Sequence, residues 1–222
     1  MRRLIAAFAL TLAAVALPAA AQEYYDVDVD LPAYPEMQPL PDSPVYWAPN
    51  VPSNYFFYDG LYWDFFNDGW YSSPWYNGPW AYVDPVYVPT YVLWVPVRYY
   101  HKPPAYFHGW HPDRPPRWGQ HWGAGWQQAH NRVYTGPRSQ NVQPAPLPHY
   151  QARFNGANYP RNPQQQVQMH SQHYAYQPRE QFVRQQYQSR GIAAPAQAQQ
   201  PQQHSQGGPS QGHRGGEDRR GR

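Results

Sequence analysis

The chain has 222 residues, of which 28 are proline, 21 tyrosine and 10 tryptophan, and its formal net charge at pH 7 is +3. With 18% aromatic residues, it lies outside the ordinary globular classes. The lack of cysteine excludes disulfides, thiolate metal ligands and a lipid anchor on an N-terminal cysteine. Because every tryptophan lies within residues 47–126, we expect only the middle of the chain to hold a core.

Charge is divided between the two halves of the chain. Residues 22–97 include ten acidic residues and no Lys or Arg, whereas residues 98–222 include fifteen Lys or Arg and four acidic residues. All ten histidines lie in the second half. This polarity predicts that the basic half contacts an anionic surface, or that the two halves attract each other within or between molecules.

The first 21 residues are predicted to be a cleavable secretory signal peptide. Arg2 and Arg3 precede an uncharged apolar stretch, Leu4–Leu17, and the small residues Ala19–Ala21 form a signal-peptidase site. The most apolar run of the remaining chain, residues 91–97, is too short to cross a bilayer. We therefore expect a periplasmic or secreted protein with no transmembrane span after cleavage, and peripheral membrane contact stays open.

Residues 22–44 are predicted to be an acidic linker. They include five prolines, a density that forbids helix and favours extended polyproline conformation. A segment of this composition is expected to act as a semi-rigid spacer.

Residues 45–100 are predicted to form a small aromatic antiparallel meander. Asp59-Gly60 is a strong hairpin signal between two runs of strand-forming residues, 55–58 and 61–66. A second turn, residues 67–69, then leads into a third short strand, residues 70–72. Aromatic residues are expected on both faces of these strands.

Two further strands are predicted at residues 91–95 and 97–100. Pro89 and Pro96 would confine them to edges or bulges, because proline cannot donate to a strand ladder. The expected fold class is therefore mostly β, a small aromatic antiparallel meander with one short amphipathic helix and long disordered flanks.

The short helix is predicted within a Pro/His/Trp segment, residues 101–135. Trp118, Trp122 and Trp126 recur at helical spacing after a proline pair. Three glycines oppose this helix, each at a cost of about 1 kcal/mol relative to alanine, so it should form only when the Trp stripe is docked. The stripe could dock on the sheet or lie at a membrane interface. Residues 136–222 are predicted to be a disordered, basic, Gln/Pro-rich tail.

The hairpin aromatics are a candidate ligand platform. Exposed Tyr and Trp rings stack on sugars, and cages of such rings bind quaternary ammonium groups such as choline. The candidate platform residues are Tyr58, Tyr62, Trp63, Trp70 and Tyr71. The alternative is that these rings are simply the core of a domain that has few aliphatic residues.

His108 and His111 are candidate metal ligands. Two imidazoles three residues apart on a helix or tight turn could share a copper or zinc ion. No cysteine or nearby carboxylate completes such a site. The motifs of serine hydrolases, zinc proteases and phosphate-binding loops are missing, so we expect no catalytic residues, no cofactor and no specific nucleic acid.

Three stretches, residues 114–126, 145–154 and 172–179, carry a family resemblance. Over residues 45–184 the chain resembles a group of exported Tyr/Trp/Pro-rich proteins of proteobacteria that have no assigned activity. The resemblance implies a signal peptide and an envelope or extracellular address. Gly123 and Gly125 stand where that group would have stronger helix formers.

The sequence thus predicts a non-enzymatic exported envelope protein with a structural or interaction role. Its basic tail would contact an anionic envelope polymer, lipid or an envelope protein. A glycan- or choline-binding module on the Tyr/Trp platform is one alternative, and a periplasmic copper- or zinc-binding protein is another.

Overall fold

The computed structural model of the chain describes residues 23–25, 27, 29–134 and 142–193. No helix within these ranges is long and apolar enough to span a membrane. The predicted signal peptide lies outside the described residues.

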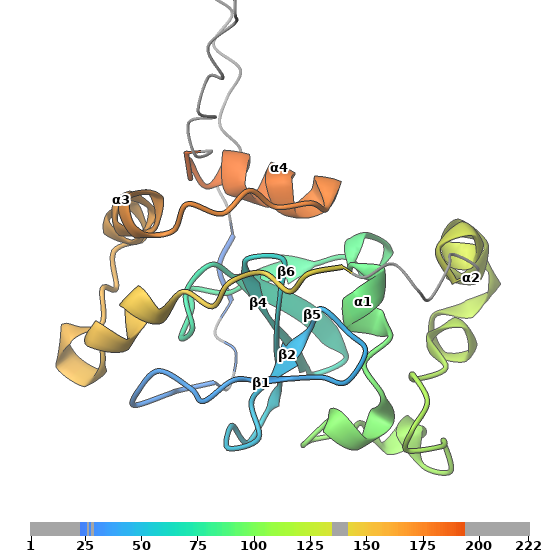
Figure 1. The fold of residues 1–222 in the computed structure, drawn as a ribbon. Helices are drawn as coiled ribbons and strands as arrows, with labels where there is room; N and C mark the ends of the chain where they lie inside the picture. The colour runs from blue at the N-terminus through green and yellow to red at the C-terminus, as the bar shows by residue number, and fades with distance from the viewer. Residues whose placement is uncertain (1–22, 26, 28, 135–141, 194–222) are drawn as a thin grey trace, which may run out of the picture.

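Six short strands form one antiparallel sheet in which each strand pairs with its neighbour in sequence (Figure 1). Both predicted hairpins of the meander are present. Asp59 and Gly60, between the third and fourth strands, have positive φ angles of 52° and 89°, as a type I′ turn requires. The strands are β1 (Gln38–Pro39), β2 (Tyr46–Trp47), β3 (Asn54–Tyr58), β4 (Leu61–Phe66), β5 (Gly69–Ser73) and β6 (Ala81–Val83).

The described residues place more of the chain in helices than in strands, so the fold is not strictly mostly β. The α-helices are α1 (Thr90–Leu93), α2 (Trp118–Tyr134), α3 (Pro163–His173) and α4 (Gln181–Ser189). The 3₁₀ helices are η1 (Pro85–Tyr87), η2 (Val97–Tyr99), η3 (Ala105–Phe107), η4 (His149–Arg153) and η5 (Gly156–Asn158).

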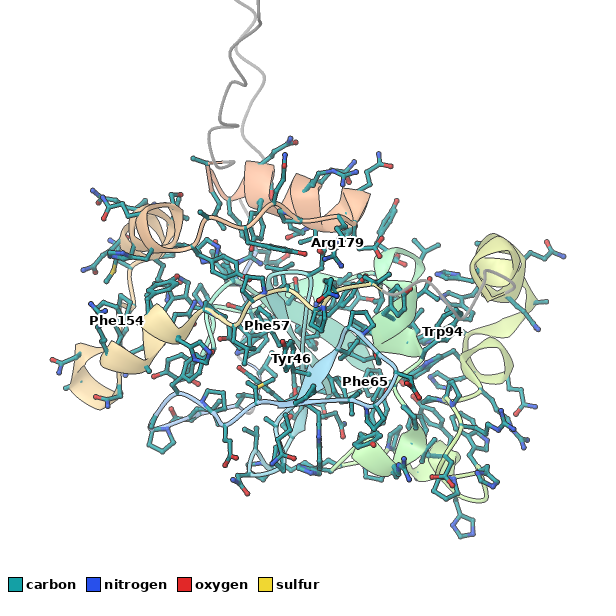
Figure 2. All side chains as sticks on the ribbon, in the orientation of Figure 1. Tyr46, Phe57, Phe65, Trp94, Phe154 and Arg179 are labelled. Carbon is teal, nitrogen blue, oxygen red and sulfur yellow. The ribbon has the colours of Figure 1, made fainter. Side chains whose placement is uncertain are left out.

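Both faces of the sheet are buried at its centre. All of β3 and most of β4 are buried, although antiparallel sheets commonly leave one face to water. Phe56 and Trp63 belong to a first core, which is covered by α1, η2, α2 and α4. Phe57 and Tyr62 belong to a second core, covered by the N-terminal segment and by residues 145–176. Figure 2 shows how densely side chains fill the space around the sheet.

The predicted acidic linker is wrong for the part that the structure describes. Val27, Val29, Leu31 and Leu40 are buried, and Gln38 and Pro39 form β1 at the edge of the sheet. The prolines exclude helix but leave the backbone extended. Alternate apolar residues of an extended segment share one face, so Val27, Val29 and Leu31 pack into the second core, whereas Leu40 packs into the first.

The predicted disordered tail is also wrong over residues 142–193. This segment forms the 3₁₀ helices η4 and η5 and the α-helices α3 and α4. Its buried residues include Gln151, His170, Val183 and Tyr187. Its few rings and aliphatic residues are widely spaced in the sequence, so they do not produce a local apolar pattern. Residues 136–141 and 194–222 lie outside the described residues, and their predicted disorder stays a prediction.

The two edge strands predicted at residues 91–100 are helical turns. Pro89 precedes α1, and Pro96 precedes η2, because proline suits the start of a helical turn as well as a sheet edge. Val92 and Leu93 are both buried although they are adjacent. Adjacent buried residues fit one side of a helical turn against a sheet, whereas in a strand they would point to opposite faces.

The first turn of the sheet is connected to the C-terminal helix through Asp59. Its buried carboxylate accepts hydrogen bonds from the backbone N–H groups of Arg179, at 2.9 and 3.0 Å, and Glu180, at 2.8 Å, and from the Tyr176 hydroxyl at 2.7 Å. These N–H groups lie at the start of α4 and have no partner within the helix. Asp59 therefore caps a helix about 120 residues away in the sequence.

His170 is a second buried connection within the C-terminal segment. Its Nδ1 lies 3.0 Å from the Tyr150 hydroxyl and its Nε2 lies 3.3 Å from the Tyr187 hydroxyl. Because the Tyr187 hydroxyl donates to the Gly60 carbonyl, a neutral ring with its proton on Nε2 satisfies all of these groups. Burial, and to a smaller extent the positive charge of Arg190, lower the pKa of His170 to about 3.

Replacing Asp59 should selectively loosen the C-terminal segment. Asp59→Asn keeps a residue that tolerates the positive φ but loses the charged acceptor, and we expect a destabilisation of about 1.5–3 kcal/mol. Urea denaturation would measure it, and hydrogen exchange should show faster opening of α4. Asp42→Asn is the matched control, because Asp42 also has a positive φ but is exposed and caps no helix. Equal effects of both substitutions would contradict the capping role.

Stability should fall as the pH is lowered below 6.5. In that range the unfolded chain protonates His170 near its ordinary pKa of about 6.5, whereas the folded chain does not until about pH 3. The free energy of unfolding should therefore decrease by up to about 1.4 kcal/mol per pH unit between these limits. His170→Gln should flatten this dependence in urea titrations from pH 7 to 5, and His108→Gln, at an exposed site, should not.

Candidate binding groove

The predicted Tyr/Trp platform is part of the core. Tyr58, Tyr62, Trp63 and Trp70 are at most 2% exposed, and only Tyr71 is half-exposed. The Tyr58 hydroxyl donates to Glu180 at 2.8 Å. Buried rings cannot stack on a ligand from solution, so the platform prediction is wrong for these four rings, which belong to the core as the alternative had it.

The predicted Trp stripe docks on the protein itself. Trp118 is fully buried, its indole N–H donates to the Leu93 carbonyl at 3.0 Å, and its ring stacks on Trp122 at 4.5 Å. Trp126 donates to the Pro85 carbonyl at 3.1 Å. Gly123 has a φ of 84° and interrupts α2, as the helix-breaking glycines suggested. The docking of the stripe on the sheet side is thus confirmed.

His108 and His111 do not meet a third ligand among the described residues. Both side chains are exposed. The Nδ1 atom of His111 accepts a hydrogen bond from the Asp113 backbone N–H at 3.1 Å, which fits a turn rather than a metal centre. The geometry gives the copper or zinc alternative no support.

Sequence reasoning missed a polar cluster at the turn between β4 and β5. Nε2 of His121 lies 2.8 and 2.9 Å from the two Asp68 carboxylate oxygens. The Tyr106 hydroxyl donates to the same carboxylate at 2.7 Å, and its ring stacks on His121 at 3.9 Å. The cluster ties η3 and α2 to the turn.

A groove with a volume of about 590 Å³ lies between four segments. The groove is lined by the turn between β1 and β2, by α1 and η2, and by the loop before α2. Figure 2 shows Trp94 on the α1 side of the molecule, away from Phe154 at the opposite end. The lining residues are Leu40, Pro41, Asp42, Ser43, Tyr91, Trp94, Pro96, Arg98, Tyr99, Asp113, Arg114, Pro115 and Pro116.

Three half-buried rings form the apolar part of the groove. Tyr91 and Trp94 meet edge to face, with ring centroids 5.8 Å apart. Tyr99 packs edge to face on Trp47 at 5.0 Å, and the Arg98 guanidinium lies 5.0 Å from the Tyr99 ring. The rings are therefore held in place before any ligand arrives.

The polar part of the groove has two positive and two negative side chains. Arg98 and Asp113 form an ion pair at 2.7 Å, but each side chain is about half exposed, so the pair adds little stability. Asp42 and Arg114 have no side-chain hydrogen bond or ion pair within the described part of the chain. These groups are available to a ligand, as donors on Arg and acceptors on Asp.

A second cavity, of about 460 Å³, lies beside Gly78. Most of its polar side chains already bond to the protein. Tyr159 and Gln166 both donate to the Gly78 carbonyl, at 2.6 and 3.0 Å, and the Asn77 side chain accepts from the Leu31 N–H at 2.9 Å. This cavity is the weaker candidate because most of its polar side chains are engaged and Tyr159 is the one aromatic residue in its described lining.

The groove residues were not singled out by the sequence. Tyr91 and Trp94 belong to a segment predicted as a strand, in which they would point to opposite faces. Their spacing of three residues would place them together on a helical turn, and this was the only available signal. Comparisons with protein-family models, curated proteins and solved structures found no match to this chain, so the groove is interpreted from its own residues.

Proposed function

We propose that this chain is an exported, non-enzymatic envelope protein that binds a glycan in the groove. The observation that carries the proposal is the combination of three held rings, Tyr91, Trp94 and Tyr99, with charged side chains that are either unpaired or joined only by an exposed ion pair. The export itself rests on the predicted signal peptide, and the address would be the periplasm or the outside of the cell.

The chemistry of a sugar matches both parts of the groove. The apolar C–H face of a pyranose stacks on Tyr and Trp rings, while its hydroxyl groups need both donors and acceptors. Arg98 and Arg114 supply donors, and Asp42 and Asp113 supply acceptors. The volume lies in the range of small-molecule sites. Rings held in place beforehand reduce the entropic cost of binding.

The groove is better suited to binding than to hydrolysis. Its described lining contains no His, Cys or Lys that could serve as a general base or nucleophile. Asp42 and Asp113 are both exposed to water, whereas the general acid of a glycosidase is held in apolar surroundings that keep it protonated. A non-enzymatic role is therefore the proposal.

In this proposal a shorter segment of the basic tail contacts the anionic partner. Residues 142–193 pack on the sheet, so contact with an anionic polymer, lipid or envelope protein would fall to residues 194–222. Choline binding is not favoured for the groove, because Arg98 lies against the ring of Tyr99, where a second cation would be repelled.

The proposal predicts that glycan binding depends on Trp94. Titration of the folded protein with soluble envelope-glycan fragments should give a saturable signal by calorimetry. Trp94→Ala should weaken binding about tenfold through loss of stacking, and Arg114→Gln should weaken it through loss of a donor. Near-ultraviolet circular dichroism would verify that both variants stay folded.

Tyr87→Ala is the matched control. Tyr87 is the most exposed of the large exposed apolar residues and does not line the groove, so its loss should leave the affinity unchanged. Binding that is equally weak in Tyr87→Ala, or that survives Trp94→Ala, would contradict the groove. Absence of binding across neutral and acidic glycans would contradict the function.

A further inference from the structure

Three tyrosines, two of them exposed and the third partly buried, form a cluster at the β6 edge of the sheet. The ring centroids of Tyr25 and Tyr71 are 5.7 Å apart, those of Tyr71 and Tyr82 are 5.8 Å apart, and those of Tyr25 and Tyr82 are 6.2 Å apart. Tyr25 is 40% and Tyr82 is 45% exposed. We refer to these three residues as the tyrosine cluster.

The backbone holds the tyrosine cluster together. Tyr71 and Tyr82 are directly opposite each other in the β5–β6 ladder, which places their side chains on the same face. Tyr25 is brought beside them by a bridge to Trp80, in which its N–H donates to the Trp80 carbonyl at 2.7 Å. The exposed ring faces are therefore a built feature of the sheet edge rather than loose side chains.

The charges that act on the tyrosine cluster itself are negative, and the Arg190 guanidinium lies over the neighbouring Tyr24 ring. Desolvation raises the pKa of Tyr82, and Asp84 and Asp68 raise it further. Desolvation and the buried Asp64 carboxylate raise the pKa of Tyr71, and desolvation and Glu23 raise that of Tyr25. An aromatic surface with Glu23 and Asp84 beside it favours a cationic partner, because cations are attracted both to ring faces and to negative charge.

The C-terminal end of the described chain lies next to the N-terminal tyrosines. The Arg190 guanidinium, just after α4, is 5.7 Å from the ring centroid of Tyr24, and Tyr24 directly precedes Tyr25. The chain then continues through residues 194–222. Residues 214–222 include four arginines and two acids, a net side-chain charge of +2.

We propose that the arginine-rich end of this chain, residues 214–222, docks on the tyrosine cluster. The guanidinium groups would stack on the exposed ring faces and lie near Glu23 and Asp84. Twenty residues, 194–213, separate this end from the described chain, and a random coil of that length would reach roughly 25 Å. Tethering raises the local concentration to about millimolar, so a weak contact is sufficient.

The docking is independent of the groove, and paramagnetic relaxation enhancement tests it separately. The chain has no cysteine, so Ser210→Cys provides a single site for a nitroxide label in the chain from residue 22 onward. Backbone amide signals of the tyrosine cluster and of Asp84 should be lost in the labelled protein and restored by reduction of the nitroxide. High salt should restore them as well.

Two variants show whether the arginines and the tyrosines carry the contact. Replacement of all four terminal arginines by glutamine should restore the lost signals, and so should Tyr82→Thr, which preserves strand propensity. Arg153→Gln and Tyr87→Thr are the matched controls and should leave the loss unchanged. Signal loss spread evenly over the protein, or unaffected by the arginine replacement, would overturn the proposal.

A mixed sample distinguishes the chain's own end from that of a second copy. In this sample, chain that is isotope-labelled but has no nitroxide is mixed with chain that has the nitroxide at residue 210 but no isotope label. Loss of the tyrosine-cluster signals in this sample would overturn docking within one molecule and would show that the occupant is the end of another copy. The proposal is supported if the signals are unchanged in the mixture but are lost in the chain that has both the isotope label and the nitroxide.

Discussion

The central strands of this sheet are apolar on both faces, and the rest of the structure depends on that constraint. A single layer would leave one set of rings in water, so each face requires a cover. Segments from the middle of the chain cover the Phe56 and Trp63 side together with α4. The N-terminal segment and residues 145–176 cover the Phe57 and Tyr62 side. Two segments of polar, proline-rich composition are thereby drawn into the fold.

Polar side chains, rather than regular secondary structure, hold these irregular covers in place. Buried Gln151 donates to the Pro74 carbonyl and accepts from the Tyr76 N–H, and buried Gln166 donates to the Gly78 and Pro160 carbonyls. Backbone groups in proline-rich segments have few ladder partners, and a buried group without a partner is costly. Glutamines that resemble low-complexity sequence therefore serve as hydrogen-bonding anchors.

The same irregular connections form the surfaces that are available to partners. The groove exists because Pro89 and Pro96 turn the chain into α1 and η2, which brings Tyr91, Trp94 and Tyr99 to one wall. The exposed tyrosine cluster exists because the N-terminal segment returns to the β6 edge at Trp80. In both places aromatic side chains that are not fully buried in the core remain partly exposed. The groove has side chains of both charges around its rings, whereas the β6 edge has carboxylates beside them.

Local signals in the sequence determined the β3–β4–β5 meander and the helical Trp stripe, because turn type and side-chain periodicity are set within a few residues. Only the tertiary structure decided which rings are buried and which are free. By sequence alone, Tyr58 and Trp63 cannot be told from rings that bind a ligand. In the fold they are covered by α4. The start of α4 is capped by Asp59, which is about 120 residues away in the sequence. Contacts over such separations leave no local pattern, so the folded C-terminal segment, the groove and the tyrosine cluster were beyond what sequence periodicity could predict.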